Sequence, residues 1–143
     1  MIGPPPLPHQ ATAVAIAGRA LMIEGPPGAG KSSLALALID RGAVLVGDDS
    51  LLLATGSGRL LARPHPRTRG LLELRNLGLL PYPACEEAPV ALLLTLDPQA
   101  PRFIEQADSA TRAGIAIPQV RLWPGSPVLA LRAEAALRHY GRG

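Results

Sequence analysis

The segment from Gly25 to Ser32, Gly-Pro-Pro-Gly-Ala-Gly-Lys-Ser, constrains the fold of this chain more than any other feature. It matches the pattern G-x-x-x-x-G-K-[ST], in which glycines allow the backbone to curl until several amide groups point at phosphate oxygens. An apolar run, Ala20 to Glu24, comes before it and predicts a strand. Ser32 to Arg41 is rich in helix formers, and Gly42 follows where a helix would end. The sequence therefore predicts a strand, a phosphate-binding loop and a helix in succession, as in an α/β fold.

The two residues that end the motif predict specific contacts with a nucleoside triphosphate and Mg²⁺. Lys31 is expected to reach the β- and γ-phosphates, and Ser32 to place its hydroxyl on Mg²⁺. Lys31 is the only lysine in a chain whose other basic side chains are all arginine, so a compact ammonium occurs only where the loop needs one. The predicted nucleotide-binding residues are Gly25, Pro26, Pro27, Gly28, Ala29, Gly30, Lys31, Ser32 and Ser33. The competing interpretation is a plain turn, in a chain with 15 glycines and 16 prolines.

Two adjacent carboxylates, Asp48 and Asp49, follow the next predicted strand, Ala43 to Val46. At a strand end beside the loop, either carboxylate could hold Mg²⁺ or act as a base. Asp48 is predicted as a metal ligand, and both residues are candidates for the base, with Asp49 preferred. The alternative for an Asp-Asp pair is a turn or a helix cap.

The rest of the chain predicts a mixed sheet with flanking helices in a single domain. The 143 residues can bury one core, and an aromatic content of 3% means that this core consists of aliphatic residues. Residues 1–8 hold four prolines and predict a disordered lead-in, so the domain is expected to span residues 9–143. The remaining predicted strands are 13–17, which forms a hairpin with Ala20 to Glu24, then 50–54, 60–62, 71–75, 90–96 and 115–122, and a final helix covers 127–140.

Charge and cysteine content narrow the function classes. The net charge is +3, but the arginines are scattered and do not alternate with aromatics, so no nucleic-acid partner is expected. Cys85 is the only cysteine, which favours a reducing cytoplasm. The N-terminus lacks a signal-peptide pattern and no apolar run approaches the length of a membrane span, so no membrane partner is expected.

The residues described so far resemble the catalytic domain of the HPr kinase/phosphorylase family, in a short form without the family's N-terminal domain. The resemblance runs from about His9 to Gly125. Gly25 to Asp49 is its most specific stretch, since the Gly-Lys-Ser triplet, Asp40-Arg41-Gly42 and the two aspartates fall at family spacing. A second stretch, Leu72 to Leu79, is similar to the family signature.

The resemblance implies an HPr kinase/PEP carboxykinase-like fold, a homo-oligomer that is a hexamer, and a protein-serine kinase. Its substrates would be ATP with Mg²⁺ and a serine on an HPr-like phosphocarrier of the phosphotransferase system. The reverse reaction would use inorganic phosphate. The resemblance also implies catalytic roles for His9, Lys31 and the Asp48-Asp49 pair, and a second Mg²⁺ carboxylate at Glu73, with Arg75 beside it.

Three positions depart from the family pattern. His9 lies one position further from the loop than usual, where Gln10 stands, and its alternative is a solvated histidine. Asn76 replaces a glycine, which is tolerable in a left-handed backbone. Ser126 stands where the family has a catalytic arginine. Two alternative functions remain: a non-catalytic nucleotide-binding regulator, which the substitutions at Asn76 and Ser126 favour, and a P-loop kinase for a small metabolite.

Overall fold

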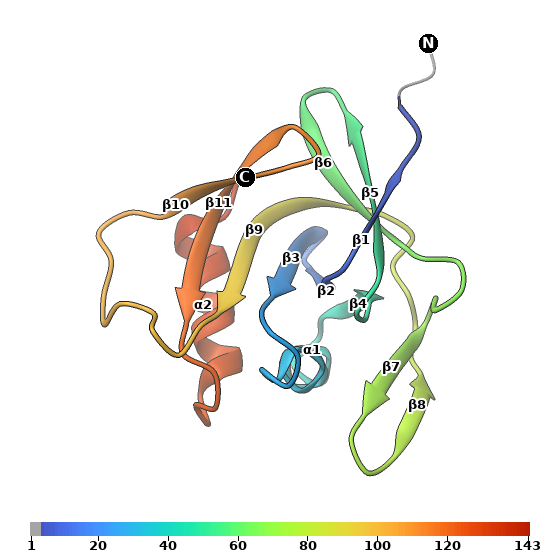
Figure 1. Ribbon diagram of the computed structural model, residues 1–143, viewed down its shortest axis with the longest axis horizontal. Coiled ribbons are helices and arrows are strands. Elements are labelled where there is room, and N and C mark those ends of the chain that lie inside the picture. Colours follow the sequence, from blue (N-terminus) through green and yellow to red (C-terminus); the bar gives the residue numbers. More distant parts are fainter. Residues whose placement is uncertain (1–3) are drawn as a thin grey trace.

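The computed structural model of this protein describes residues 4–143 (Figure 1). Within them the elements follow in this order: β1 (Leu7–His9), β2 (Thr12–Ile16), β3 (Arg19–Glu24), α1 (Lys31–Asp40), β4 (Val44–Gly47), β5 (Leu51–Gly56), β6 (Arg59–Pro64), β7 (Leu71–Leu74), β8 (Gly78–Pro81), β9 (Ala88–Leu96), β10 (Asp108–Arg112), β11 (Ile115–Leu122) and α2 (Leu129–Tyr140). The predicted single α/β domain with a mixed sheet and two helices is confirmed.

Nine strands form one curled, mixed sheet. The order along it is β1-β5-β6-β9-β3-β2-β4, and β11 pairs with β9 and carries β10 on its other side. Strands β3, β9 and β11 run parallel, whereas the other pairings are antiparallel. The ends of the three parallel strands therefore meet at one edge, where the arrowheads of Figure 1 point the same way. Strands β7 and β8 form a separate hairpin.

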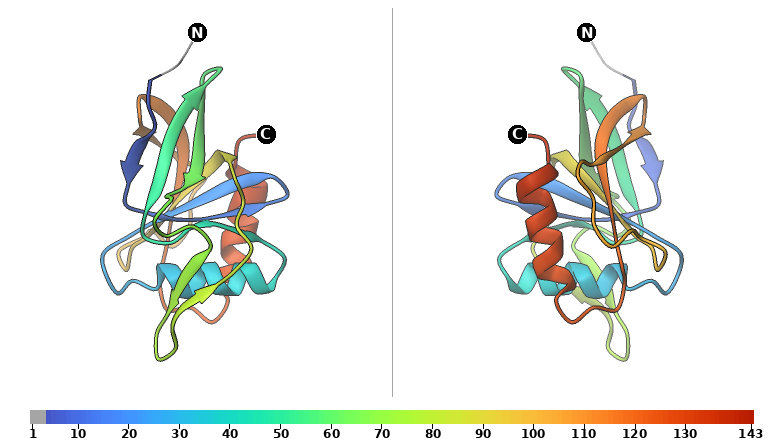
Figure 2. Two further views of the ribbon diagram at one scale, coloured as in Figure 1. Left: turned by 90° about the vertical axis from the view of Figure 1, so that its right-hand side faces the viewer. Right: turned by 90° about the vertical axis from the view of Figure 1, so that its left-hand side faces the viewer.

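Both faces of the central strands are buried, which explains why their sequences are almost continuously apolar. Leu21 and Ile23 of β3 belong to a core shared with helices α1 and α2. Their neighbours Ala20 and Met22 belong to a second core, on the other face, which is enclosed by the curl of the sheet. Figure 2 shows the two helices on one side of the sheet and the strands folding over the other.

The hairpin predicted before the phosphate loop is confirmed. Strands β2 and β3 pair antiparallel, and the turn residues Ala17 and Gly18 have φ angles of 51° and 82°. Two successive positive φ angles are what a two-residue hairpin of this twist requires. The hairpin directs β3 straight into the loop that begins at Gly25.

Three strands were not predicted from the sequence. Strand β1 begins inside the predicted lead-in, because Leu7 and Pro8 pair with Leu53 and Leu52 at an edge of the sheet, where proline's missing N–H is tolerated. Residues 1–3 of that lead-in lie outside the described part of the chain. The mostly exposed strands β8 and β10 lack the alternation of apolar and polar residues that marks a half-buried strand. Neither helix in the described residues has the length and apolar character needed to cross a membrane.

Candidate phosphate-binding and catalytic site

The glycine-rich segment forms a tight loop between β3 and α1. Gly30 has a φ of 99° and caps the helix, a conformation that side chains strongly disfavour. Gly25 packs directly on the end of β9: a Cβ there would lie 3.2 Å from the Leu96 carbonyl oxygen. The loop thus follows a strand and precedes a helix, as the motif predicted, and the N-terminal end of α1 faces the space that the loop encloses.

The Lys31 side chain folds back over its own loop. Its Nζ donates hydrogen bonds to the carbonyl oxygens of Gly25 at 2.8 Å and Pro26 at 3.1 Å. These contacts hold the ammonium over the loop, although Lys31 is the first residue of the helix.

The Asp48 carboxylate is the centre of the hydrogen-bond network at the site. Asp48 is only 7% exposed, and Oδ1 accepts hydrogen bonds from the hydroxyls of Ser32 at 2.7 Å and Thr12 at 3.0 Å. Its Oδ2 accepts one from the backbone N–H of Glu73 at 2.9 Å. Three segments that are far apart in sequence, α1, β2 and β7, are therefore joined through one buried carboxylate.

Asp49 has a different environment from its neighbour. It is exposed, with a φ of 63°, in the left-handed region that aspartate enters more readily than most residues. Its backbone N–H donates to the Thr12 hydroxyl at 3.2 Å, and one carboxylate oxygen accepts from Gln10 Nε2 at 3.3 Å. Its carboxylate therefore stays accessible, whereas that of Asp48 is enclosed.

These residues line one cleft of about 560 Å³ beside the loop. Its lining residues are Thr12, Pro27, Gly28, Gly30, Lys31, Ser32, Ser33, Asp48, Asp49, Glu73, Arg75 and Asn76. The structure thus brings together the loop, the two aspartates and the signature hairpin β7–β8. Asn76 has a φ of 72°, which confirms the left-handed backbone expected where it replaces glycine. Arg75 extends over the loop, with Nη2 3.9 Å from the position of a Cβ on Gly28.

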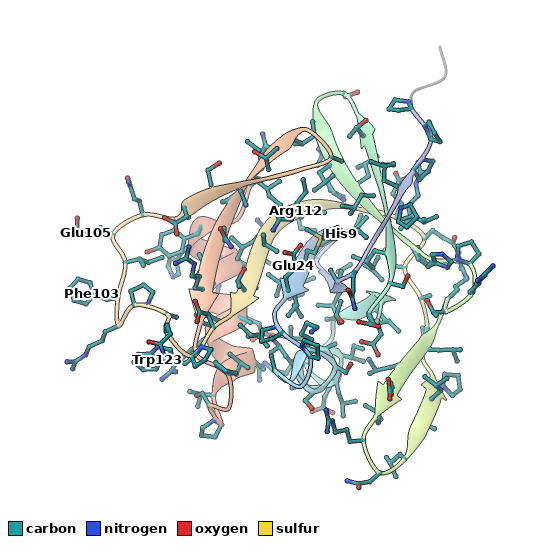
Figure 3. All side chains as sticks on the ribbon, viewed as in Figure 1. His9, Glu24, Phe103, Glu105, Arg112 and Trp123 are labelled. Atoms are coloured by element: carbon teal, nitrogen blue, oxygen red, sulfur yellow. The ribbon has the colours of Figure 1, made fainter. Side chains whose placement is uncertain are left out.

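His9 lies outside the set of described residues that line the cleft. Its Nε2 is 2.7 Å from Glu24 Oε2, and the Arg112 guanidinium binds both oxygens of the same carboxylate, at 3.1 and 2.7 Å (Figure 3). Burial by itself raises the pKa of Glu24, but the hydrogen bonds and positive charges of Arg112 and His9 outweigh it, so the pKa lies below its ordinary value. Glu24 in turn raises the pKa of Arg112. The residue before the phosphate loop is therefore held by an ionic cluster on strands β1, β3 and β10.

Oxygen ligands are present in the cleft for Mg²⁺, which prefers oxygen donors and usually retains water and substrate phosphates. The hydroxyl of Ser32 and the carboxylate of Asp48 meet at 2.7 Å, and Glu73 lines the same cleft. No group of three or more His, Cys, Asp or Glu side chains suited to a metal occurs among residues 4–143. A Mg²⁺ site in which substrate phosphates and water supply the remaining ligands does not need three such side chains.

Sequence reasoning missed Thr12 and the cluster around Glu24. Thr12 is 1% exposed and stands between buried alanines, so a single hydroxyl in an apolar strand was the only signal. For Glu24 and Arg112 there was no local signal, because 88 residues separate them.

Comparison with known proteins identifies the family of this chain. The model of the HPr Serine kinase C-terminal domain matches residues 7–84, a span that contains both sequence stretches described above. The HPr kinase/phosphorylase of Mycoplasma mycoides is 30% identical over 73% of this chain, and that of Clostridium beijerinckii is 42% identical over 47%. The matched regions make up 36% and 22% of those two proteins, so this chain corresponds to a minor part of their length.

The fold has a counterpart among solved structures. The HPr(Ser) kinase/phosphatase from Coxiella burnetii superposes with a TM-score of 0.82 over 92% of this chain and 94% of that one, at 24% identity. The curled mixed sheet and its two helices are therefore the architecture of that protein. With more than half of its residues matched by the family model, this chain belongs to the HPr serine kinase C-terminal domain family.

Proposed function

We propose that this chain is a protein-serine kinase that transfers the γ-phosphoryl group of ATP to a serine of an HPr-like phosphocarrier. The observation that carries the proposal is the convergence of Lys31, Ser32, Asp48 and Asp49 on one cleft beside the glycine-rich loop. Membership of a kinase family supports the same reaction.

The loop would bind the triphosphate. Its backbone amides and the N-terminal end of α1 favour negative charge. The Lys31 ammonium, which now contacts the carbonyl oxygens of Gly25 and Pro26, would exchange these for β- and γ-phosphate oxygens. Arg75, above Gly28, offers a second cation on the same side of the cleft.

Ser32 and Asp48 would hold Mg²⁺, and Glu73 would supply a further carboxylate. When bound, the ion neutralises charge on the phosphates and orients them. The Thr12 hydroxyl and the Glu73 backbone N–H donate hydrogen bonds to the Asp48 carboxylate and would orient it. Metal-binding carboxylates commonly have such hydrogen-bond partners.

Asp49 would act as the base. Its side chain lines the cleft and is exposed, whereas the Asp48 carboxylate already accepts three hydrogen bonds, from Thr12, Ser32 and the Glu73 backbone N–H. In the forward reaction Asp49 would take the proton of the acceptor serine hydroxyl, whose oxygen attacks the γ-phosphorus as the bond to ADP breaks. In the reverse reaction an oxygen of inorganic phosphate would attack the phosphoserine phosphorus. The bond between the serine oxygen and phosphorus would break, Asp49 would pass the proton of the attacking phosphate to the departing serine oxygen, and pyrophosphate would be released.

The proposal includes a catalytic domain, predicted over residues 9–143 and extended to Leu7 by strand β1, together with a cytoplasmic location and a homo-oligomer, the hexamer that the family resemblance implies. His9 would act indirectly, since its imidazole contacts Glu24 at the entrance to the loop.

A non-catalytic nucleotide-binding regulator is the second candidate. It is favoured by Ser126, which stands in place of the family's arginine and whose Oγ instead accepts a hydrogen bond from the Val128 N–H at the start of α2. This contact is structural and adds no cation to the cleft.

One assay separates the two candidates. The purified chain is incubated with ATP, Mg²⁺ and an HPr-like phosphocarrier, and phosphoserine is measured by mass spectrometry. The kinase proposal expects transfer that disappears in Asp49→Asn. ATP binding without transfer, in the presence of a phosphocarrier that another kinase can phosphorylate, would favour the regulator.

A further inference from the structure

A groove on the far side of α2 from α1 combines aromatic and arginine side chains. We call it the α2 groove and define it by Arg102, Phe103, Arg121, Trp123, Arg132 and Tyr140, from the 101–104 loop, the end of β11 and helix α2. It consists of two adjoining pockets of about 330 and 260 Å³, which share Arg102, Arg121 and Arg132. None of these residues lines the phosphate cleft.

The groove gathers nearly all the aromatic side chains of the protein. The chain has one Phe, one Trp and two Tyr, and only Tyr82 lies elsewhere. Phe103 is 77% exposed and Trp123 is 43% exposed. The indole of Trp123 is held in place, since its N–H donates to the Ala100 carbonyl at 2.6 Å. Exposed, oriented aromatics beside arginines are the composition of protein-binding hot spots.

The charge of the groove selects an acidic partner. Arg102 and Arg132 form no ion pair with any carboxylate in residues 4–143, and Arg121 reaches Asp108 only at 3.9 Å. Glu105, labelled next to Phe103 in Figure 3, lies outside the lining. A symmetric pairing of two copies through this face would bring like-charged arginines together, which disfavours a second copy as the occupant.

One end of the groove, at Trp123, lies at the same sheet edge as the phosphate loop. Leu122, the last residue of β11, pairs with Leu96 of β9, on which Gly25 packs. Trp123 follows directly. In Figure 1 the ends of β3, β9 and β11 lie along this edge, with α1 and α2 beside them. A folded protein seated at this end of the groove would therefore lie beside the strand ends from which the phosphate loop starts.

We propose that the α2 groove is a docking site for the phospho-acceptor protein, which would insert an apolar side chain flanked by carboxylates between Phe103, Trp123 and the arginines. This inference rests on the proposed kinase function and adds to it a surface for recognition of the substrate outside the reacting groups. The site would raise affinity for the intact acceptor without taking part in phosphoryl transfer.

The test compares two acceptors and two readouts. The acceptors are an intact HPr-like phosphocarrier and a short peptide that contains its acceptor serine but lacks the rest of the folded surface. The double variant Arg102→Glu/Arg132→Glu should raise KM for the intact acceptor about tenfold or more and leave its kcat, and turnover of the peptide, unchanged. Phe103→Ser should act in the same direction. Since Trp123 is the only tryptophan, its fluorescence should change on titration with a tryptophan-free acceptor, and this change should require about tenfold more acceptor in the double variant.

Arg138→Glu is the matched control, because Arg138 is an exposed arginine of α2 outside the groove lining. It should leave both KM values and the fluorescence titration unchanged. Equal KM values for wild type and double variant would overturn the docking site while leaving the kinase proposal intact. Loss of peptide turnover in the double variant, or its conversion from an oligomer to a monomer in sedimentation, would also overturn it. Absence of transfer from wild type to both acceptors would refute the kinase proposal itself, and the docking proposal with it.

Discussion

The Thr12 hydroxyl donates a hydrogen bond to the buried Asp48 carboxylate at 3.0 Å and, through the same oxygen, accepts one from the Asp49 backbone N–H at 3.2 Å. One side chain on β2 thus sets the positions of two consecutive acidic residues whose environments differ. The neighbouring pair Ser32 and Asp48 connects the same network to the first turn of α1. These hydrogen bonds therefore fix the positions of the two aspartates relative to the helix that follows the phosphate loop.

Replacing Thr12 by valine should destabilise the protein by about 1–3 kcal/mol, because it removes one of the three hydrogen-bond donors to the buried Asp48 carboxylate and the acceptor of the Asp49 N–H. Urea unfolding measures this loss. Thr12→Ser keeps the hydroxyl and should retain more of the stability. An unfolding free energy for Thr12→Val equal to that of wild type would mean that water replaces the hydroxyl at no cost.

Lys31→Ala should weaken ATP binding by about 10- to 100-fold, since a charge-assisted hydrogen bond contributes about 1.5–3 kcal/mol. Titration calorimetry with ATP and Mg²⁺ measures the change. Arg138→Ala, which removes an exposed cation distant from the loop residues in sequence, serves as the control. Equal ATP affinities for Lys31→Ala and wild type would rule out the phosphate-binding role of this loop.

Asp49→Asn should lower kcat for phosphoryl transfer by roughly 10²- to 10⁴-fold, the usual contribution of a general base, and leave ATP affinity nearly unchanged. Asparagine tolerates the positive φ of this position, so folding should be preserved. Asp48→Asn should in addition lower stability, because an amide NH₂ would face one of three hydrogen-bond donors. Transfer retained in Asp49→Asn and lost in a folded Asp48→Asn would assign the base to Asp48.

Gly47→Ala should destabilise the protein by about 1–3 kcal/mol through overpacking. Its backbone φ is not positive, but a Cβ there would lie 2.6 Å from Leu51 Cδ2 and 2.8 Å from the Ser50 carbonyl oxygen. Gly56→Ala is the matched control, because its nearest contact is an ordinary 3.7 Å to Leu61 Cδ1. Thermal unfolding of both variants should show a loss for Gly47→Ala alone, and equal melting temperatures would contradict the predicted clash.

The ionic cluster predicts how stability depends on pH. The pKa of Glu24 in the folded protein lies below its ordinary value of 4.5, because Arg112 and His9 outweigh the effect of burial. A carboxylate with a depressed pKa adds stability above its unfolded pKa, and this stability is lost as pH falls through the folded value. The difference in unfolding free energy between wild type and Glu24→Gln should therefore shrink as the pH falls below about 4.5. Glu105→Gln, at an exposed acid with no ion pair to a described residue, should show no such trend.

Local patterns were sufficient to predict the elements whose cause is local. The β2–β3 hairpin, the loop from Gly25 to Ser32 and helix α1 follow from glycine conformation, strand propensity and a terminating glycine, all within a few residues of one another. The apolar run of β9 predicted a central strand because burial of both faces removes the alternation of residue types. Within the candidate site, the phosphate loop and the Asp48-Asp49 pair could also be predicted from the sequence, because each is a contiguous motif.

Tertiary structure decided what depends on contacts between distant segments. Strand β1 forms because β5 offers an unpaired edge, and His9 contacts Glu24, which also binds Arg112, and does not line the cleft. The different environments of the two adjacent aspartates likewise come from distant segments: donors from β2, α1 and β7 enclose Asp48, while Asp49 is exposed. The sequence alone determined the phosphate loop and the elements around it, because their causes lie within a few residues. The partners of each side chain were determined only by folding, because sequence separation carries no information about which segments the curl of the sheet brings together.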